Sequence, residues 1–267
     1  MLNYPVLFVH GMGFRDMKLI NYWGRIPKIF TDDGNRVFYG GQDSNGSVED
    51  NALVLKERVE TIISETGIQK FNVIAHSKGG LDMRYAICRL GISDHIASLT
   101  TINTPHNGSK TIDKILKLPQ FPIKFGSACT DIWMRVLGDK NPRTYNVIKS
   151  FSTDYADYFN EKNRDIDGIY YQSYACVMKK SSSDIFMWFS HMIVNVIEGE
   201  NDGFLTPAGV KHGNFKGIVR SNSGRGISHC DEVDMRRRRF TKKEGEGVSD
   251  IIELYKDILQ SLKDENL

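Results

Sequence analysis

The chain has 267 residues, of which 40% are hydrophobic and 25% are charged, and its formal net charge at pH 7 is +2. Such a chain has enough apolar residues for a large core, whereas the small net charge does not indicate nucleic acid or an anionic membrane as a partner. No apolar run approaches the roughly 18 residues that a membrane-spanning helix needs.

The chain begins without the pattern of a secretory signal. Residues 1–5 lack a charged segment followed by an apolar stretch, and a buried strand is expected at once. The sequence is therefore compatible with a cytoplasmic protein or with one secreted without a visible signal peptide. Nothing in the pattern indicates an oligomeric state.

Strand and helix patterns alternate along the first hundred residues. The expected strands are residues 5–9, 36–39, 71–75 and 96–102. The expected helices are residues 22–30, 47–67 and 78–90. Ser47 and Asp50 resemble a capping box at the start of the second helix, and Gly67 is a typical helix end. This alternation predicts a mostly parallel central sheet flanked by helices on both faces.

Beyond residue 104 the apolar spacing becomes helical. We expect residues 105–167 to be a helical insertion over the sheet, within one domain that comprises residues 1–267. Its apolar stripes at 112–116 and 132–137 are typical either of core helices or of a lid with an exposed apolar face. Later strands are expected at 170–178 and 217–220, and a terminal helix at 248–262.

The segment Phe71-Asn72-Val73-Ile74-Ala75-His76-Ser77-Lys78-Gly79-Gly80 resembles a nucleophile elbow. Ser77 lies between a buried strand and a helix, with Ala75 and Gly79 two residues away on either side. A strand-to-helix turn of this kind is so tight that larger side chains would collide with neighbouring backbone. The pattern predicts a nucleophilic Ser77, and the alternative is a serine that only caps the helix.

A serine hydroxyl needs a neighbouring base, which is itself oriented by an acid. In a chain with a nucleophile elbow the order is serine, acid, histidine, with both partners on loops after later strands. Of the histidines, His191, His212 and His229 lie far enough along the chain. We favour His229, which follows the last expected strand and precedes the terminal helix, and we expect His106 to be a loop residue.

The acid should precede His229 on another loop that ends a strand. Asp202, in the turn Asn201-Asp202-Gly203, follows the apolar run of residues 192–197 and satisfies the chain order. Asp184 and Glu200 are competitors. A turn aspartate also serves backbone hydrogen bonds, which is the structural alternative for Asp202.

Stabilisation of an oxyanion requires two backbone N–H donors. Lys78, directly after the nucleophile, supplies one. The loop after the first strand, Val9-His10-Gly11-Met12-Gly13, has two glycines that allow its backbone to turn toward the site. Met12 is therefore expected to supply the second donor.

These motifs together resemble those of bacterial triacylglycerol lipases of the α/β-hydrolase fold, of the Pseudomonas and clostridial type. The motifs are Val9-His10-Gly11-Met12-Gly13, Ala75-His76-Ser77-Lys78-Gly79-Gly80, Asn103-Thr104-Pro105-His106-Asn107-Gly108, Asn201-Asp202-Gly203 and His229-Cys230-Asp231-Glu232-Val233. They follow the order found in that family and span most of the chain.

The resemblance implies a catalytic triad of Ser77, Asp202 and His229, with Met12 and Lys78 as oxyanion donors. It also implies that the helices after Pro105 form a lid over an acyl-binding groove. Lys78 stands where relatives commonly have His, Gln or Met, and the sequence offers no interpretation of its charge.

The resemblance bears on metals as well. Relatives often bind a structural calcium through an aspartate two residues after the catalytic histidine, which Asp231 matches, and through a second one, for which Asp184 is an approximate candidate. We expect no cofactor requirement and no metal among the catalytic residues. The four cysteines show no paired spacing, which predicts neither disulfides nor a cysteine-type zinc site. Residues 236–239, all arginine, are expected to be a solvated charge run.

The expected function is therefore that of a serine carboxylic-ester hydrolase, a triacylglycerol lipase or carboxylesterase that forms an acyl-enzyme. Its expected partner is an acyl ester such as an acylglycerol, met in solution or at a lipid–water interface. Phospholipids, polyesters and thioesters remain open as substrates, because the same residues serve them. The alternative is a non-catalytic protein of the same fold that binds a hydrophobic ligand or partner.

Overall fold

The computed structural model describes residues 1–15, 21–243 and 245–267. Within these residues, six strands form one sheet in the order β2-β1-β3-β4-β5-β6, and each neighbouring pair is parallel. The strands are β1 (Val6–Val9), β2 (Val37–Tyr39), β3 (Phe71–His76), β4 (Ile96–Ile102), β5 (Tyr170–Cys176) and β6 (Asn214–Val219). The predicted α/β-hydrolase sheet is thus confirmed, and the carboxyl ends of its strands share one edge.

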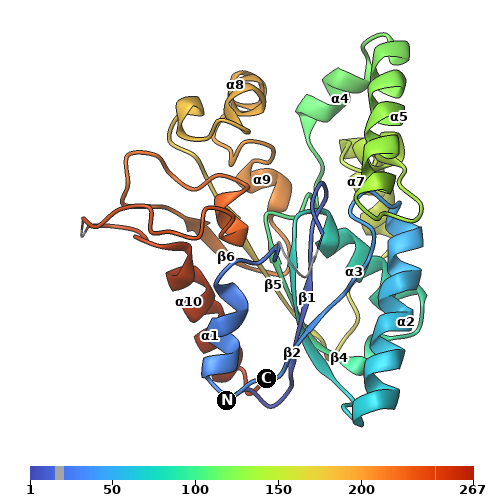
Figure 1. The fold of residues 1–267 in the computed structure, drawn as a ribbon, viewed down its shortest axis with the longest axis vertical. Coiled ribbons are helices and arrows are strands. Elements are labelled where there is room, and N and C mark those ends of the chain that lie inside the picture. Colours follow the sequence, from blue (N-terminus) through green and yellow to red (C-terminus); the bar gives the residue numbers. More distant parts are fainter. Residues whose placement is uncertain (16–20, 244) are drawn as a thin grey trace.

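Helices cover both faces of the sheet (Figure 1). Helices α1 (Ile26–Asp32) and α10 (Ile251–Asp264) lie together on one face, and α2 (Val48–Thr66) and α3 (Lys78–Arg89) lie on the other. Each face has its own apolar cluster between sheet and helices. Every residue of β3 is buried, as expected for a parallel strand covered on both sides.

Local sequence signals place several helix ends. The Ser47 side chain accepts a hydrogen bond from the Asp50 N–H, and Gly67 ends α2 with a φ of 72° that suits glycine. Helix α1 begins only at Ile26, later than the apolar stripe suggested, with Pro27 in its first turn. Helix α10 begins three residues later than expected, where Asp250 caps it.

The remaining helices gather beyond the carboxyl edge of the sheet. Between β4 and β5 the chain forms α4 (Lys110–Leu116), α5 (Gln120–Val136), α6 (Thr144–Lys149) and α7 (Thr153–Lys162). Between β5 and β6 it forms η2 (Ser181–Ser183), α8 (Trp188–Ile197) and α9 (Pro207–Val210). Short 3-10 turns are η1 (Ser93–His95) and η3 (Asp231–Val233). In Figure 1, α4 and α5 stand on one side of this end and α8 stands on the other.

Candidate active site

Ser77 occupies a strained corner between β3 and α3. Its backbone has φ 52° and ψ −131°, a region that residues with a side chain rarely adopt. The corner is crowded: a Cβ on Gly79 would lie 2.4 Å from the His10 carbonyl oxygen, and one on Gly80 would lie 2.2 Å from Thr104 Oγ1. Small residues are therefore required after Ser77, as the elbow pattern predicted.

The imidazole of His229 connects the serine to a carboxylate. His229 Nε2 lies 3.0 Å from Ser77 Oγ, and His229 Nδ1 lies 2.6 Å from Asp202 Oδ2. The three side chains come from positions separated by 125 and 27 residues along the chain (202 − 77 and 229 − 202). Each is within hydrogen-bonding reach of the next, so the arrangement is able to move a proton from the hydroxyl to the ring.

Asp202 is held as a carboxylate by its surroundings. It is fully buried, and its Oδ1 accepts hydrogen bonds from the N–H groups of Phe204 at 2.8 Å and Leu205 at 2.7 Å. Burial opposes ionisation, but the His229 ring and these two N–H groups outweigh it, so the pKa of Asp202 lies below its ordinary value. Its loop follows helix α8, not a strand, because residues 192–197 are helical.

Asn103 is a residue whose role the sequence did not indicate. It follows β4 with a φ of 39°, and its side-chain amide donates to Asp202 Oδ2 while its Oδ1 accepts from the Cys176 N–H at 2.7 Å. It therefore ties the acid to the ends of two strands. An asparagine directly after the expected strand 96–102 is the sequence signal that could have found it, since asparagine tolerates a left-handed backbone conformation.

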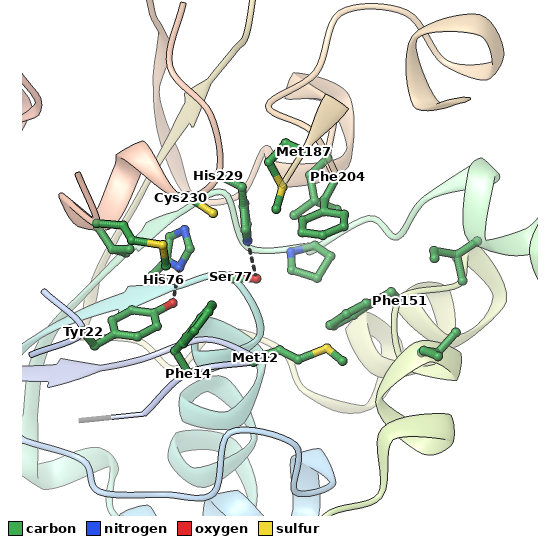
Figure 2. Close-up of a pocket in the computed structure, with 17 residues that line it drawn as sticks. Met12, Phe14, Tyr22, His76, Ser77, Phe151, Met187, Phe204, His229 and Cys230 are labelled. Atoms are coloured by element: carbon green, nitrogen blue, oxygen red, sulfur yellow. Dashed lines mark hydrogen bonds between the residues drawn. The ribbon is translucent and has the colours of Figure 1, made fainter. Parts of the chain in front are cut away.

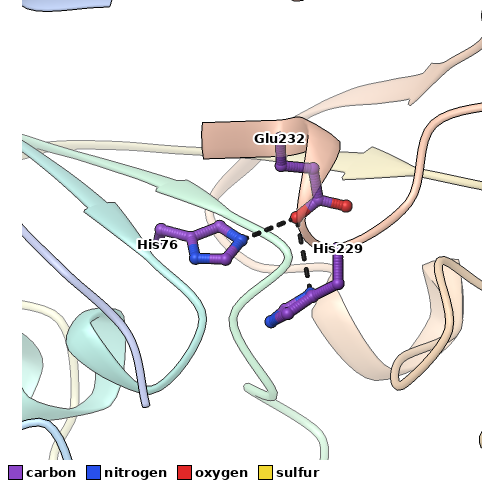
Figure 3. Close-up of side chains that lie close together, drawn as sticks. All are labelled: His76, His229 and Glu232. Carbon is purple, nitrogen blue, oxygen red and sulfur yellow. Dashed lines mark hydrogen bonds and ion pairs between the residues drawn. The ribbon is translucent and has the colours of Figure 1, made fainter. Parts of the chain in front are cut away.

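A second acid lies beside the ring of His229 (Figure 3). Glu232 Oε2 is 3.5 Å from His229 Nδ1 and 2.8 Å from His76 Nε2, and the Glu232 side chain has no exposed surface. Burial first, and then the charge of Asp202 and a hydrogen bond with it, raise the pKa of Glu232 well above its ordinary value. The direction favours a neutral Glu232 carboxyl beside Asp202, with Oε2 accepting a hydrogen bond from His76 Nε2.

His76 extends this network to the loop after β1. Burial first, and then the neighbouring imidazoles, hold the pKa of His76 well below its ordinary value, which favours a neutral ring. The Tyr22 hydroxyl donates to His76 Nδ1 at 2.7 Å and accepts from the Gly11 N–H at 3.0 Å. Neutral His76 then carries its proton on Nε2, facing Glu232. The network therefore joins the Gly11 loop to the His229 loop.

The cluster of His76, His229 and Glu232 has the residue types of a metal site, and its candidate ligand atoms lie within 4.8 Å of one another. The hydrogen bonds of these side chains argue against a metal ion at this place. Both ring nitrogens of His229 already face Ser77 and Asp202, and both ring nitrogens of His76 face Tyr22 and Glu232. A metal ion here would have to replace the contact between His229 and Asp202.

The two residues expected to donate to an oxyanion, Met12 and Lys78, lie close to Ser77. Met12 lines the cavity beside Ser77, and among the described residues its N–H has no acceptor (Figure 2). The loop is fixed on either side, because the Gly11 N–H donates to Tyr22 and the Gly13 N–H donates to Asn45. Lys78 is in the first turn of α3, where N–H groups lack an intrahelical acceptor.

The side chain of Lys78 points into the protein. Its Nζ lies 2.6 and 2.8 Å from the two carboxylate oxygens of Asp82, one helical turn on, and Asn51 donates to the same carboxylate at 2.8 Å. Lys78 and Asp82 have side chains that are each 1% exposed. The charge that the sequence left without an interpretation is therefore neutralised beneath the helix.

A cavity of about 330 Å³ opens at Ser77 (Figure 2). Its walls come from the Met12 loop, the α4–α6 insertion, the segment before α8 and the loops of Asp202 and His229. The apolar side chains that line it are Met12, Phe14, Ile112, Ile148, Phe151, Met187, Phe204, Leu205, Val233 and Met235. Its polar lining side chains are those of Ser77, Tyr22, His76 and His229, and the rest of the lining is apolar, which suits an acyl chain.

Helices α5 and α8, beyond the carboxyl edge of the sheet (Figure 1), have exposed apolar side chains. On α5 these are Phe121, Phe125, Ile132, Trp133 and Val136, each at least 60% exposed. On and before α8 they are Ile185, Phe186, Trp188, Phe189 and Val196, each at least 49% exposed. The stripe at 132–137 is thus largely an exposed face and not core. Among the described helices, none is both long and apolar enough to cross a membrane.

The residues proposed for calcium do not fit an ion as they stand. Arg236 lies between them, with Nη2 2.7 Å from Asp184 Oδ2 and Nε 2.9 Å from Asp231 Oδ1. The prediction of a fully solvated arginine run is therefore wrong for Arg236, which is 23% exposed, whereas Arg237, Arg238 and Arg239 are exposed.

The competing residues lie elsewhere. Glu200 pairs with Arg220 at the surface, and the His191 ring contacts Ser181 at 2.8 Å. His106 and His212 stack on each other with ring centroids 4.3 Å apart, and His106 is buried against Arg84. His106 is thus a packed interior residue, and none of these four reaches Ser77.

Comparison with known proteins gives a consistent picture. The sequence model of the family described as palmitoyl protein thioesterase matches residues 5–176, which include Met12, Ser77 and Asn103. Triacylglycerol lipase 2 of Saccharomyces cerevisiae is 29% identical over 257 residues, covering 91% of this chain and 73% of the yeast protein.

Bacterial relatives match over a shorter stretch. A triacylglycerol lipase of Pseudarthrobacter phenanthrenivorans is 34% identical over 151 residues, 54% of this chain and 47% of that protein. The solved lipase of Staphylococcus hyicus superposes with a TM-score of 0.68 at 14% identity, over 98% of this chain and 96% of its own. At 14% identity, the similarity to the Staphylococcus hyicus lipase shows a shared fold only.

Proposed function

The chain belongs to the palmitoyl protein thioesterase family and is an ester hydrolase of the lipase and esterase type, and from this premise we propose that it cleaves acyl esters through a covalent intermediate on Ser77. The observation that carries the proposal is the continuous hydrogen-bonded series Ser77–His229–Asp202 at the mouth of an apolar cavity.

In the proposed reaction, Ser77 Oγ attacks the acyl carbonyl while His229 Nε2 takes its proton. Asp202 holds the ring in the tautomer that accepts at Nε2 and stabilises the imidazolium that forms. The N–H groups of Met12 and Lys78 receive the oxyanion, each contributing about 3 kcal/mol to lowering the barrier. His229 then returns the proton to the leaving alcohol, and water, with His229 as base, releases the acid.

The cavity supports a medium-length acyl group. If each methylene takes roughly the 30 Å³ that water occupies in the liquid, about 330 Å³ holds on the order of ten carbons. The aromatic side chains of Phe14 and Phe151 line the cavity (Figure 2). Acylglycerols and simple alkyl esters with such chains are the proposed substrates, with α4–α7 acting as a lid.

A lipid–water interface is the proposed location of the substrate. Residues 110–149 contain eight lysines and arginines against three aspartates, a net charge of +5 (8 − 3), while the whole chain is +2. All three aspartates already accept hydrogen bonds from the protein. The exposed apolar residues of α5 therefore stand in a basic surface, a combination that favours anionic lipid surfaces.

Hydrolysis of p-nitrophenyl butyrate, octanoate and palmitate tests the proposal. We expect turnover to be highest with octanoate and to fall by at least about 10⁴-fold in Ser77→Ala, since the acyl-enzyme cannot form. Cys129→Ala, an exposed position on α5, is the matched control and should keep the activity.

Two outcomes would contradict the proposal. Full turnover in Ser77→Ala would assign the reaction to another group. Binding of a fatty acid without turnover of any of the three esters would favour the non-catalytic alternative. If the palmitate ester, below its critical micelle concentration, were hydrolysed faster than the octanoate ester, only the proposed acyl chain length would be contradicted.

A further inference from the structure

Two buried carboxylates lie behind the loop that bears His229. Asp184 follows η2, and Asp231 is two residues beyond His229; their side chains are 2% and 6% exposed. Removing two like charges from water is unfavourable unless a cation lies between them. Carboxylate oxygens are also the ligands that calcium prefers, so the cation between the two acids is either a calcium ion or a cationic side chain.

Arg236 supplies the positive charge. Besides its contacts to Asp184 and Asp231, its Nη2 donates to the Ser183 carbonyl oxygen at 3.1 Å. Guanidinium is planar, permanently charged and able to donate several hydrogen bonds from a fixed fork. One side chain thereby hydrogen-bonds one carboxylate and one carbonyl and forms an ion pair with the second carboxylate, a set that a divalent ion would otherwise hold.

The bridge fixes the loop on both sides of His229. Ser228 Oγ donates to Asp184 Oδ2 at 2.6 Å, and the Ser228 N–H donates to Asp231 Oδ2 at 3.2 Å. The residue before His229 is therefore tied to both acids, and Arg236 ties the two acids to each other. Removing the guanidinium would leave two buried carboxylates to repel each other behind the loop that bears His229.

We propose that Arg236 is a built-in cation that takes the structural place of a metal ion and positions the His229 loop without calcium. Its neighbours Arg237, Arg238 and Arg239 are exposed, so of the four arginines only Arg236 has this role. Arg236 is a positioning residue, because it acts on His229 through Asp184, Ser228 and Asp231 and does not touch Ser77. Its effect on turnover rests on the proposed ester hydrolysis, whereas its effect on unfolding does not.

The test compares the full-length protein with Arg236→Gln and with the exposed control Arg238→Gln. Thermal unfolding is followed with a chelator and with millimolar calcium, and kcat and KM are measured with p-nitrophenyl octanoate well below the unfolding temperature. We expect the unfolding temperatures of the unmodified protein and of Arg238→Gln to be the same in both solutions.

For Arg236→Gln we expect an unfolding temperature lower by about 5–10 °C, since one partner of a buried charge cluster is lost. Calcium should raise it again, because the freed carboxylates and the Ser183 carbonyl offer oxygen ligands. In Arg236→Gln we also expect kcat to fall while KM is retained, and calcium to restore kcat. That pattern would indicate a displaced His229, whereas a general loss of folding would not produce it.

Three results would overturn the inference. A chelator that lowers the unfolding temperature of the unmodified protein would show that a bound metal holds this loop. Arg236→Gln as stable as Arg238→Gln would show that the bridge positions nothing. An Arg236→Gln protein that calcium does not stabilise would show that the acids are no metal-type site. Absence of turnover in the unmodified protein would contradict the proposed function and leave the unfolding tests valid.

Discussion

Replacing Lys78 by methionine tests how much the buried pair beneath the elbow contributes to stability. Lys78 and Asp82 are four residues apart on α3, with Nζ 2.6 and 2.8 Å from the carboxylate oxygens and both side chains 1% exposed. Removal of one partner leaves a buried charge, which destabilises by about 3–5 kcal/mol. At about 2–4 °C per kcal/mol, the unfolding temperature should fall by roughly 6–20 °C.

The chain offers a matched comparison. Lys28 and Asp32 have the same spacing and residue types at 2.5 Å, but their side chains are 73% and 62% exposed. Lys28→Met should therefore cost less than about 1 kcal/mol, because water screens an exposed pair. The double variant Lys78→Met/Asp82→Asn should recover most of the stability, since neither charge remains buried.

Urea unfolding and thermal unfolding of the four proteins at constant pH measure these differences. Equal losses in Lys78→Met and Lys28→Met would refute the reasoning, as would a double variant no more stable than the single one. Turnover adds a second check: the backbone N–H of residue 78 survives the substitution, so the folded fraction should keep kcat within several-fold. A folded but inactive Lys78→Met would show that the ammonium group itself takes part.

Three further expectations follow from the geometry. Asp202→Asn should lower kcat by up to about 10⁴-fold. Burial and then the charge of Asp202 raise the pKa of Glu232, so without that charge the Glu232 carboxyl beside His229 ionises more readily and partly replaces the lost acid. Adding Glu232→Gln should therefore lower kcat further; no additional loss in the double variant would contradict this. Burial holds the pKa of His106 well below its ordinary value. The unfolded chain therefore binds one more proton at this residue, and the free energy of unfolding should fall as the pH drops below about 6.5, by at most about 1.4 kcal/mol per pH unit. In urea unfolding between pH 7 and pH 5, His106→Gln should reduce the dependence of this free energy on pH. An unchanged pH dependence would refute the prediction. Gly79→Ala should destabilise by at least about 1–3 kcal/mol because its Cβ would meet the His10 carbonyl oxygen, whereas Gly126→Ala, with open space around it, should not; equal unfolding midpoints would contradict the packing argument.

Much of this architecture was predictable from local sequence pattern. The individual strands of the sheet, the elbow at Ser77 and the helix beginning after Ser47 each depend on residues contiguous along the chain. Backbone geometry and apolar periodicity act over a few residues, so their sequence signals are direct. The chain order of Ser77, Asp202 and His229 was likewise readable, because it is tied to strand order.

Charge pairing was decided by the tertiary structure. Arg236 stands in a run of four arginines that looked equally solvated, and only the folding of η2 against the His229 loop places Asp184 beside it. No role for Glu232 followed from the sequence, yet burial and the nearby Asp202 favour its neutral form. Which charged groups are buried, and which partners they meet, depends on how segments far apart in the chain pack against one another. Neither the net charge of +2 nor the spacing of residues along the chain contains that information.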